Sequence, residues 1–186
     1  GAGAVKAPFP WFGGKRRAAA LAWAAMGTVG SYCEPFYGSG AVHLARPNPS
    51  GVETINDVDG YVVNFWRATR ADPDAVLAYT TGPSAELDLA ARHRWLVTTA
   101  RARLEALRDD PEAYDVKVAG WWLWGICRWI GSGWCVTGAA QAPSIPKGIA
   151  ATGKMPATRR RRDLDQEVMR ALSDRLQHVR ILCGDW

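Results

Sequence analysis

The stretch YCEPFYGSG at residues 32–40 is the part of the chain best suited to ligand chemistry. Gly38 and Gly40 stand between an expected strand and an expected helix, and such a turn lets a ligand approach backbone amides closely. Asp57 follows 17 residues after Gly40, at the end of the next expected strand. A carboxylate there can accept hydrogen bonds from ribose hydroxyls. Together these residues predict a site for a nucleoside-containing ligand, with a plain structural turn as the alternative.

The charge of this loop narrows the choice of ligand. Its glycines do not follow the GxGxxG pattern, and Glu34 puts a negative charge where a phosphate-binding loop would avoid one. Both features disfavour a dinucleotide and favour a cationic nucleoside without phosphate. S-adenosylmethionine fits this description because it has a ribose, a sulfonium and an ammonium group. We therefore expect S-adenosylmethionine as the cofactor.

Excess positive charge gathers in a single segment. The net charge is +5, and the segment 136–162 holds six basic residues and no acidic one, while the rest of the chain has 17 basic and 18 acidic residues. Such a patch suits a polyanion such as nucleic acid, and a solvated loop is the alternative. The six residues are Lys147, Lys154, Arg159, Arg160, Arg161 and Arg162.

Composition excludes several other classes. Of the 186 residues, 48% are hydrophobic and 22% charged, so a core can form and global disorder is excluded. No apolar run approaches the roughly 20 residues of a membrane helix, and no signal peptide opens the chain. Four cysteines without a CxxC pair, beside three histidines, disfavour a structural zinc site and a disulfide framework. We expect a cytoplasmic protein with no metal and no membrane partner.

The first 70 residues predict the elements that must position the loop. Helix formers, glycine breaks and apolar runs follow the order β-loop-α-β-α, which is typical of a parallel sheet covered by helices. The expected strands are 32–34 and 51–57, and the expected helices are 14–26, 40–45 and 60–69.

The pattern becomes helical after Arg70 and returns to a strand at the end of the chain. We predict helices over 72–79, 85–107 and 111–130, a loop over 131–158, a helix over 163–177 and a strand over 179–183. The prediction is therefore an α/β fold with three parts. They are a cofactor-binding core in 1–70, a helical insertion with the basic loop in 71–162, and a return to the core in 163–186.

Three motifs follow one another in the chain: FPWFGGK at 9–15, EPFYGSG at 34–40 and NDVD at 56–59. Their order and spacing resemble those of the adenine-specific DNA methyltransferases of the DNA adenine methylase family. The sequence is particularly similar to phage and actinobacterial members with WWxWGIC and WIGSGWC stretches. The resemblance covers nearly the whole chain and is loose between Asp72 and Asp110. It implies a Rossmann-like methyltransferase sheet with a target-recognition insertion, and methyl transfer from S-adenosylmethionine to the exocyclic amino group of adenine in double-stranded DNA.

The resemblance also implies roles for individual residues. Lys15 can pair with the cofactor carboxylate, and Glu34 can hold its ammonium group. Asp57 would bind the ribose, and Asp185 and Trp186 would lie near the cofactor adenine. The full set of expected cofactor-binding residues is Trp11, Lys15, Glu34, Pro35, Phe36, Gly38, Gly40, Asp57, Asp185 and Trp186.

The expected recognition region is rich in tryptophan. The run 119–130 is apolar around the whole helix, so most of its rings should be core. Arg128 and Trp129 match a family position where an aromatic ring stacks at the site that a flipped base vacates. These two residues, with the basic segment, are the expected DNA-binding residues. A packed Trp129 and a structurally paired Arg128 are the alternative.

The family's catalytic Asp-Pro-Pro-Tyr is absent, because the chain contains no Pro-Pro pair. We therefore expect the amino-terminal part of a methyltransferase that is inactive alone. It would either bind a polypeptide that supplies the missing part or associate with itself. A non-catalytic fragment that binds cofactor and DNA is the alternative, whereas a nucleotide-binding α/β protein of other function is disfavoured by Glu34.

Overall fold

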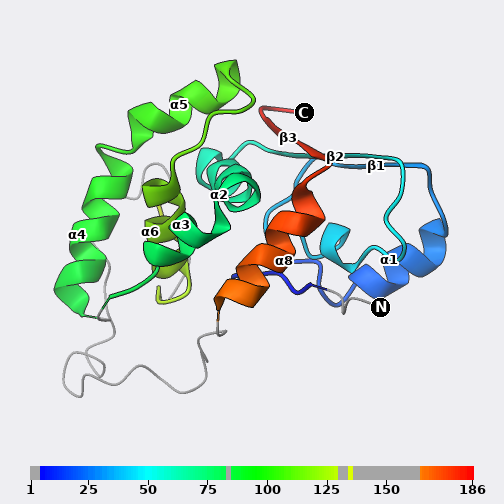
Figure 1. Cartoon of the computed structure of the whole chain (residues 1–186), viewed down its shortest axis with the longest axis horizontal. Coiled ribbons are helices and arrows are strands. Elements are labelled where there is room, and N and C mark those ends of the chain that lie inside the picture. The colour runs from blue at the N-terminus through cyan, green and yellow to red at the C-terminus, as the bar shows by residue number, and fades with distance from the viewer. Residues whose placement is uncertain (1–4, 83–84, 130–133, 136–163) are drawn as a thin grey trace.

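The computed structural model describes residues 5–82, 85–129, 134–135 and 164–186. Its sheet has three parallel strands in the order β1 (Ser31–Glu34), β2 (Val52–Asp57) and β3 (Val179–Cys183) (Figure 1). The central strand therefore pairs with a strand close in sequence and with one from the end of the chain. This register places Glu34 opposite Ile55 and Asp57 opposite Cys183, so the carboxyl ends of all three strands lie at one edge.

Helix α2 (Gly60–Ala71) lies at the centre of the molecule and packs against β2 and β3. It begins where the Asp59 carboxylate accepts a hydrogen bond from the Tyr61 amide, a side-chain cap of the kind that satisfies a free N–H at a helix start. All residues from Tyr61 to Thr69 are buried. A helix buried on every side must have neighbours besides the sheet, and the following helices supply them.

Four helices follow α2 in the described part of the chain between Pro73 and Ile126. They are α3 (Pro73–Ala78), α4 (Glu86–Val97), α5 (Arg101–Asp109) and α6 (Val116–Ile126), and Figure 1 shows them gathered on the side of α2 away from α1 (Ala19–Met26). One hydrophobic core includes Ile55 of the sheet, Phe65 and Trp66 of α2, and Trp122 of α6. The helices after Arg70 therefore share the core of the sheet.

The prediction that most tryptophan rings between residues 121 and 134 belong to the core is confirmed for three of the five. Trp122 and Trp124 are 1% exposed and Trp134 is 7% exposed. Trp121 and Trp129 are partly buried at the edge of the same core.

Four helix predictions need correction. The helix expected over 111–130 is shorter, because Asp115 caps its start and it spans only Val116–Ile126. The single helix expected over 85–107 is wrong, because the chain breaks between α4 and α5 where Thr98 turns its hydroxyl back to the Arg94 carbonyl at 2.7 Å. The helix expected over 14–26 begins only at Ala19, and the one expected over 40–45 is a three-residue 3₁₀ helix, η1 (His43–Ala45). The last helix, α8 (Gln166–Leu176), is capped by Asp165.

Within the described ranges, no helix is long and apolar enough to cross a membrane. The described residues also contain no group of three His, Cys, Asp or Glu side chains that could hold a metal ion. All four cysteines are free thiols.

Candidate functional site

The carboxyl ends of the three strands are joined by the side chain of Asn56. Its Nδ2 donates to the carbonyl oxygen of Pro35 at 3.1 Å and to that of Gly184 at 3.0 Å. The backbone carbonyl oxygen of Asn56 accepts from the Tyr37 amide at 3.0 Å. Asn56 thus fixes the loop after β1 to the turn after β3. Sequence reasoning missed this role, although a polar residue ending an apolar strand directly before Asp57 was a visible signal.

Gly38 lies at the centre of the loop and is held by three neighbours. Its amide donates to Asp57 Oδ2 at 2.8 Å, and its carbonyl oxygen accepts from Trp66 Nε1 at 2.9 Å. Its φ is +52°, and a Cβ atom placed on it would lie 2.4 Å from Nε1 of Trp11. The indole of Trp11 therefore lies directly against the loop backbone, and both the backbone conformation and this close approach require glycine.

A pocket of about 220 Å³ opens beside Trp11 and the loop. Lys15 and Glu34 stand in its wall, with Lys15 Nζ 3.3 Å from Glu34 Oε1 and 3.2 Å from the carbonyl oxygen of Phe36. The other lining residues are Trp11, Phe12, Gly13, Gly14, Phe36, Tyr37, Ser39 and Ala41.

Glu34 is buried, with 5% of the residue exposed, yet its carboxylate has several partners. Besides Lys15, it accepts a hydrogen bond from the Tyr32 hydroxyl at 2.8 Å. Burial and the neighbouring carboxylate raise the pKa of Tyr32, so this phenol stays protonated and donates. The pocket wall therefore presents a fixed negative charge beside a half-exposed ammonium group, an arrangement complementary to a zwitterion.

The structure brings the predicted cofactor residues together in two groups. Trp11, Lys15, Glu34 and Phe36 line the pocket. Asp57 lies beside Gly38 instead and is partly exposed. Its Oδ1 accepts from the Asp59 amide at 3.0 Å, and the residue lines a separate narrow crevice.

The four remaining predicted cofactor residues apart from Gly38 do not line the pocket. Pro35 is fixed through its carbonyl by Asn56, and Gly40, with φ +67°, lies under the Tyr37 ring. Asp185 and Trp186 are exposed after β3, beyond Gly184, whose amide donates to the Asp57 carbonyl at 3.2 Å.

Arg128 and Trp129 follow α6, and both take part in packing. The Arg128 guanidinium lies 4.5 Å from the Trp124 ring centroid, and its Nη1 donates to the Trp124 carbonyl at 2.9 Å. Trp129 stacks on His93 with centroids 5.4 Å apart.

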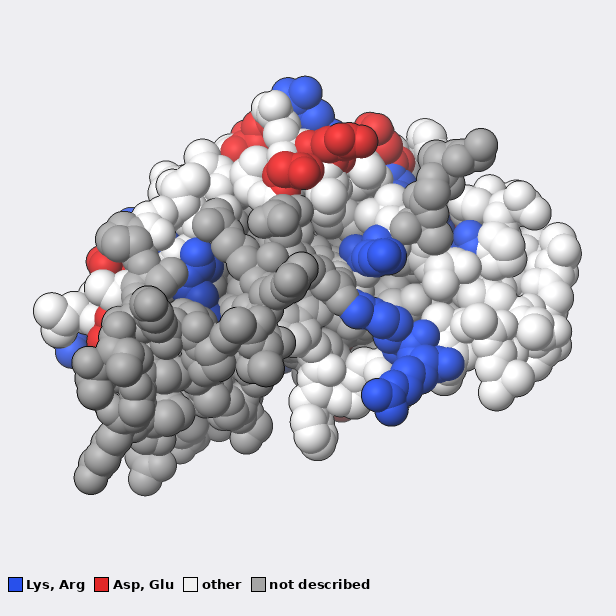
Figure 2. Space-filling view, turned by 90° about the horizontal axis from the view of Figure 1, so that it is seen from below, with Lys and Arg blue, Asp and Glu red and all other residues white. Residues whose placement is uncertain are grey.

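The remaining predicted DNA-binding residues, Lys147, Lys154, Arg159, Arg160, Arg161 and Arg162, lie outside the described residues. On the described surface, Figure 2 shows Lys and Arg side chains gathered near the middle of one face, with Asp and Glu along one edge.

Residues 11–116, more than half of the chain, match the family profile described as D12 class N6 adenine-specific DNA methyltransferase. This range begins at Trp11 and includes the loop, Asp57 and helices α2 to α5. A comparison with curated proteins found no match.

Proposed function

Because the chain belongs to the D12 class N6 adenine-specific DNA methyltransferase family, we propose that it binds S-adenosylmethionine and DNA for methyl transfer to the exocyclic amino group of adenine. S-adenosylmethionine supplies the methyl group from its sulfonium, and this transfer needs close positioning of the two reactants and no covalent enzyme intermediate.

The observation that carries the proposal is the Lys15–Glu34 pair in the pocket wall. The methionine part of S-adenosylmethionine is a zwitterion, so Lys15 would hold its carboxylate and Glu34 its ammonium group. The pocket volume of about 220 Å³ is smaller than the roughly 300–1,000 Å³ of sites that enclose whole ligands. It suits the amino-acid end of the cofactor, with Trp11 and Phe36 as its apolar walls.

We place the nucleoside part of the cofactor toward Asp57. Each oxygen of this carboxylate accepts one backbone N–H bond, from Gly38 and from Asp59. Because a carboxylate oxygen has two lone pairs, both oxygens retain capacity for ribose hydroxyls. Asp185 and Trp186 would then lie near the adenine.

For DNA we propose the segment 71–162, with Arg128, Trp129 and the six basic residues of 136–162 as contacts. The basic residues would bind phosphates, which supplies affinity with little dependence on sequence. Arg128 and Trp129 would act at the target base. The family's Asp-Pro-Pro-Tyr is absent from these 186 residues, and we assign no catalytic residue to them.

That absence supports a second candidate function, a cofactor- and DNA-binding unit that does not transfer methyl groups alone. Incubation with labelled S-adenosylmethionine and an adenine-containing duplex separates the two candidates. We expect no more label in DNA than with the Gly38→Ala variant. Turnover clearly above that variant would show that the 186 residues contain the catalytic groups.

Cofactor binding itself is tested by calorimetry with S-adenosylmethionine on Lys15→Met and Glu34→Gln. Loss of a hydrogen bond to a charged group costs about 1.5–3 kcal/mol, so each variant should bind at least about tenfold more weakly. The control is Arg170→Met, which removes an exposed ion pair with Asp74 on α8 and α3. Equal affinities for the two pocket variants and this control would reject the assignment.

A further inference from the structure

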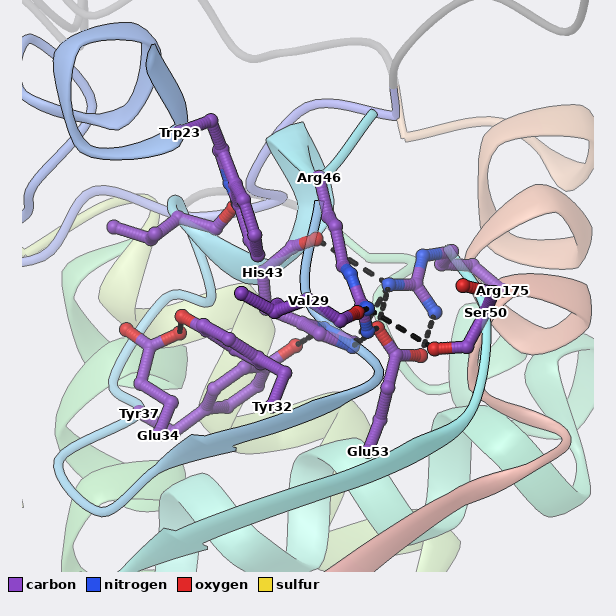
Figure 3. Close-up of polar contacts among 11 residues, drawn as sticks. Trp23, Val29, Tyr32, Glu34, Tyr37, His43, Arg46, Ser50, Glu53 and Arg175 are labelled. Carbon is purple, nitrogen blue, oxygen red and sulfur yellow. Dashed lines mark hydrogen bonds and ion pairs between the residues drawn. The ribbon is translucent and has the colours of Figure 1, made fainter. Parts of the chain in front are cut away.

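A buried polar cluster lies beneath the loop and joins it to helix α8. Glu53 of β2 is at its centre, between Arg46 and Arg175, and Figure 3 shows Arg175 reaching from α8 toward this carboxylate. The Nη1 and Nη2 atoms of Arg175 lie 2.6 and 2.7 Å from the two Glu53 oxygens. This bidentate geometry is the strongest form of an arginine–carboxylate pair. Burial raises the pKa of Glu53, but hydrogen bonds from His43, Arg175 and Arg46 outweigh it and lower the pKa.

The next member of the cluster is His43, whose ring is completely buried. Its Nε2 lies 2.9 Å from Nη2 of Arg175 and 3.3 Å from Oε1 of Glu53, and its Nδ1 lies 2.8 Å from the hydroxyl of Tyr37. Burial lowers the pKa of His43, so the ring is neutral near pH 7. A neutral imidazole has one donor and one acceptor nitrogen, and here both have a partner that fixes the ring orientation.

Tyr37 connects this cluster to the backbone of the loop. Its ring occupies the space beside Gly40, where an added Cβ would lie 2.6 Å from the Tyr37 Cζ and hydroxyl oxygen. Its carbonyl accepts the Gly40 amide at 2.9 Å. The position of the Tyr37 ring therefore sets where the chain can turn after Gly38.

We propose that Tyr37, His43 and Arg175 form a positioning relay that holds the loop 35–40 in the shape that the cofactor pocket requires. This inference rests on the proposed function, because the ligand of the pocket is taken to be S-adenosylmethionine. Arg175 orients His43, His43 orients the Tyr37 hydroxyl, and the Tyr37 ring supports Gly40. The guanidinium, the imidazole and the phenol hydroxyl thus act on the loop and need no contact with the cofactor.

The relay is tested with Tyr37→Phe, His43→Gln and the double variant. Tyr37→Phe keeps the ring and removes only the hydroxyl, and His43→Gln loses the group at the Nδ1 position. The control is Ser173→Ala on the same helix as Arg175. Ser173 is also buried, and its replacement by alanine removes a 2.7 Å hydrogen bond from its hydroxyl to the Arg70 carbonyl. The two readouts are the affinity for S-adenosylmethionine and hydrogen exchange of the Gly40 amide without cofactor.

Each single variant should bind S-adenosylmethionine about five- to tenfold more weakly, and the double variant should bind no more weakly than the weaker single one. Residues that act as one unit give such non-additive effects. Ser173→Ala should leave the affinity unchanged at a similar loss of stability. Losses that multiply in the double variant, or an equal loss in Ser173→Ala, would overturn the relay. If His43→Gln fails to fold, Tyr37→Phe against Ser173→Ala decides the question.

Hydrogen exchange of the Gly40 amide, measured without cofactor, separates failure of the relay from failure of the proposed function. Faster exchange in the relay variants but not in Ser173→Ala supports the relay even if the unmodified protein binds no S-adenosylmethionine, in which case only the proposed cofactor is rejected. Unchanged Gly40 exchange in the relay variants overturns the relay.

Discussion

Replacing Gly38 by alanine tests whether the contact between Trp11 and the loop backbone shapes the pocket. The new Cβ would lie 2.4 Å from Trp11 Nε1 and 2.6 Å from Trp11 Cδ1. Ordinary contacts of such atoms begin near 3.4 Å. The indole must therefore move by about 1 Å, and the indole is also a wall of the pocket.

Two contributions add to the loss of unfolding free energy in Gly38→Ala. A side chain at the positive φ of +52° costs roughly 1–3 kcal/mol of backbone strain. Forcing an extra carbon into a packed contact costs about 1–3 kcal/mol more. Gly27 has a φ of +65° and a ψ of −147°, and no atom lies within 4 Å of a Cβ placed on it, so Gly27→Ala carries backbone strain of its own without a packing cost. We expect the packing contact with Trp11 to cost Gly38→Ala about 1–3 kcal/mol of unfolding free energy, a cost that Gly27→Ala does not share.

Urea unfolding of both variants measures this difference, and calorimetry with S-adenosylmethionine measures its consequence for the pocket. Gly38→Ala should bind the cofactor at least about tenfold more weakly, and Gly27→Ala should bind it normally, because a difference of about 1.4 kcal/mol corresponds to a factor of ten. If the two variants lose equal stability and equal affinity, the contact with Trp11 does not hold the pocket in shape.

Three further results are expected. Asp57→Ala should weaken S-adenosylmethionine binding by about 1.5–3 kcal/mol in calorimetry, whereas Lys154→Ala should not; equal affinities would exclude a ribose contact at Asp57. Replacing Arg159–Arg162 by alanine should flatten the slope of log affinity for DNA against log salt, because fewer counterions are released; an unchanged slope would make this run a solvated loop. Stability should fall as pH drops below about 6.5, since burial lowers the pKa of His43 and His93 and the unfolded chain then binds more protons. It should fall again below about 4.5, where the unfolded Glu53 takes up a proton that the folded state excludes. Urea midpoints at pH 8, 6, 5 and 4 check both steps, and a midpoint that rises on acidification would contradict them.

Local sequence signals determined most of the strands and helices of this protein. Apolar runs and glycine breaks predicted all three strands to within a residue. The helix predicted over 60–69 is α2, which the Asp59 cap starts at Gly60 and which continues to Ala71, two residues further than expected. Such signals act over a few residues and can be read directly from the chain. The break at Thr98 was missed because helix formers on both sides of it favour one continuous helix.

The motifs in the sequence also identified the family, and the matching profile confirms that prediction. They placed Glu34 and Asp57 near one ligand, but they did not separate the pocket of Glu34 from the crevice of Asp57. Trp11 lines only the pocket, Asp57 lines only the crevice, and Tyr37 lines both.

Only the tertiary structure decided which distant side chains support the site. Asn56 bonds to Gly184 across 128 positions of the sequence, and Arg175 pairs with Glu53 across 122. These contacts exist because β3 and α8 return to the sheet in one register and one orientation, which long-range packing selects and no local pattern encodes. The sequence by itself therefore determined the family and the position of the loop 35–40, whereas the tertiary fold decided what holds that loop in place.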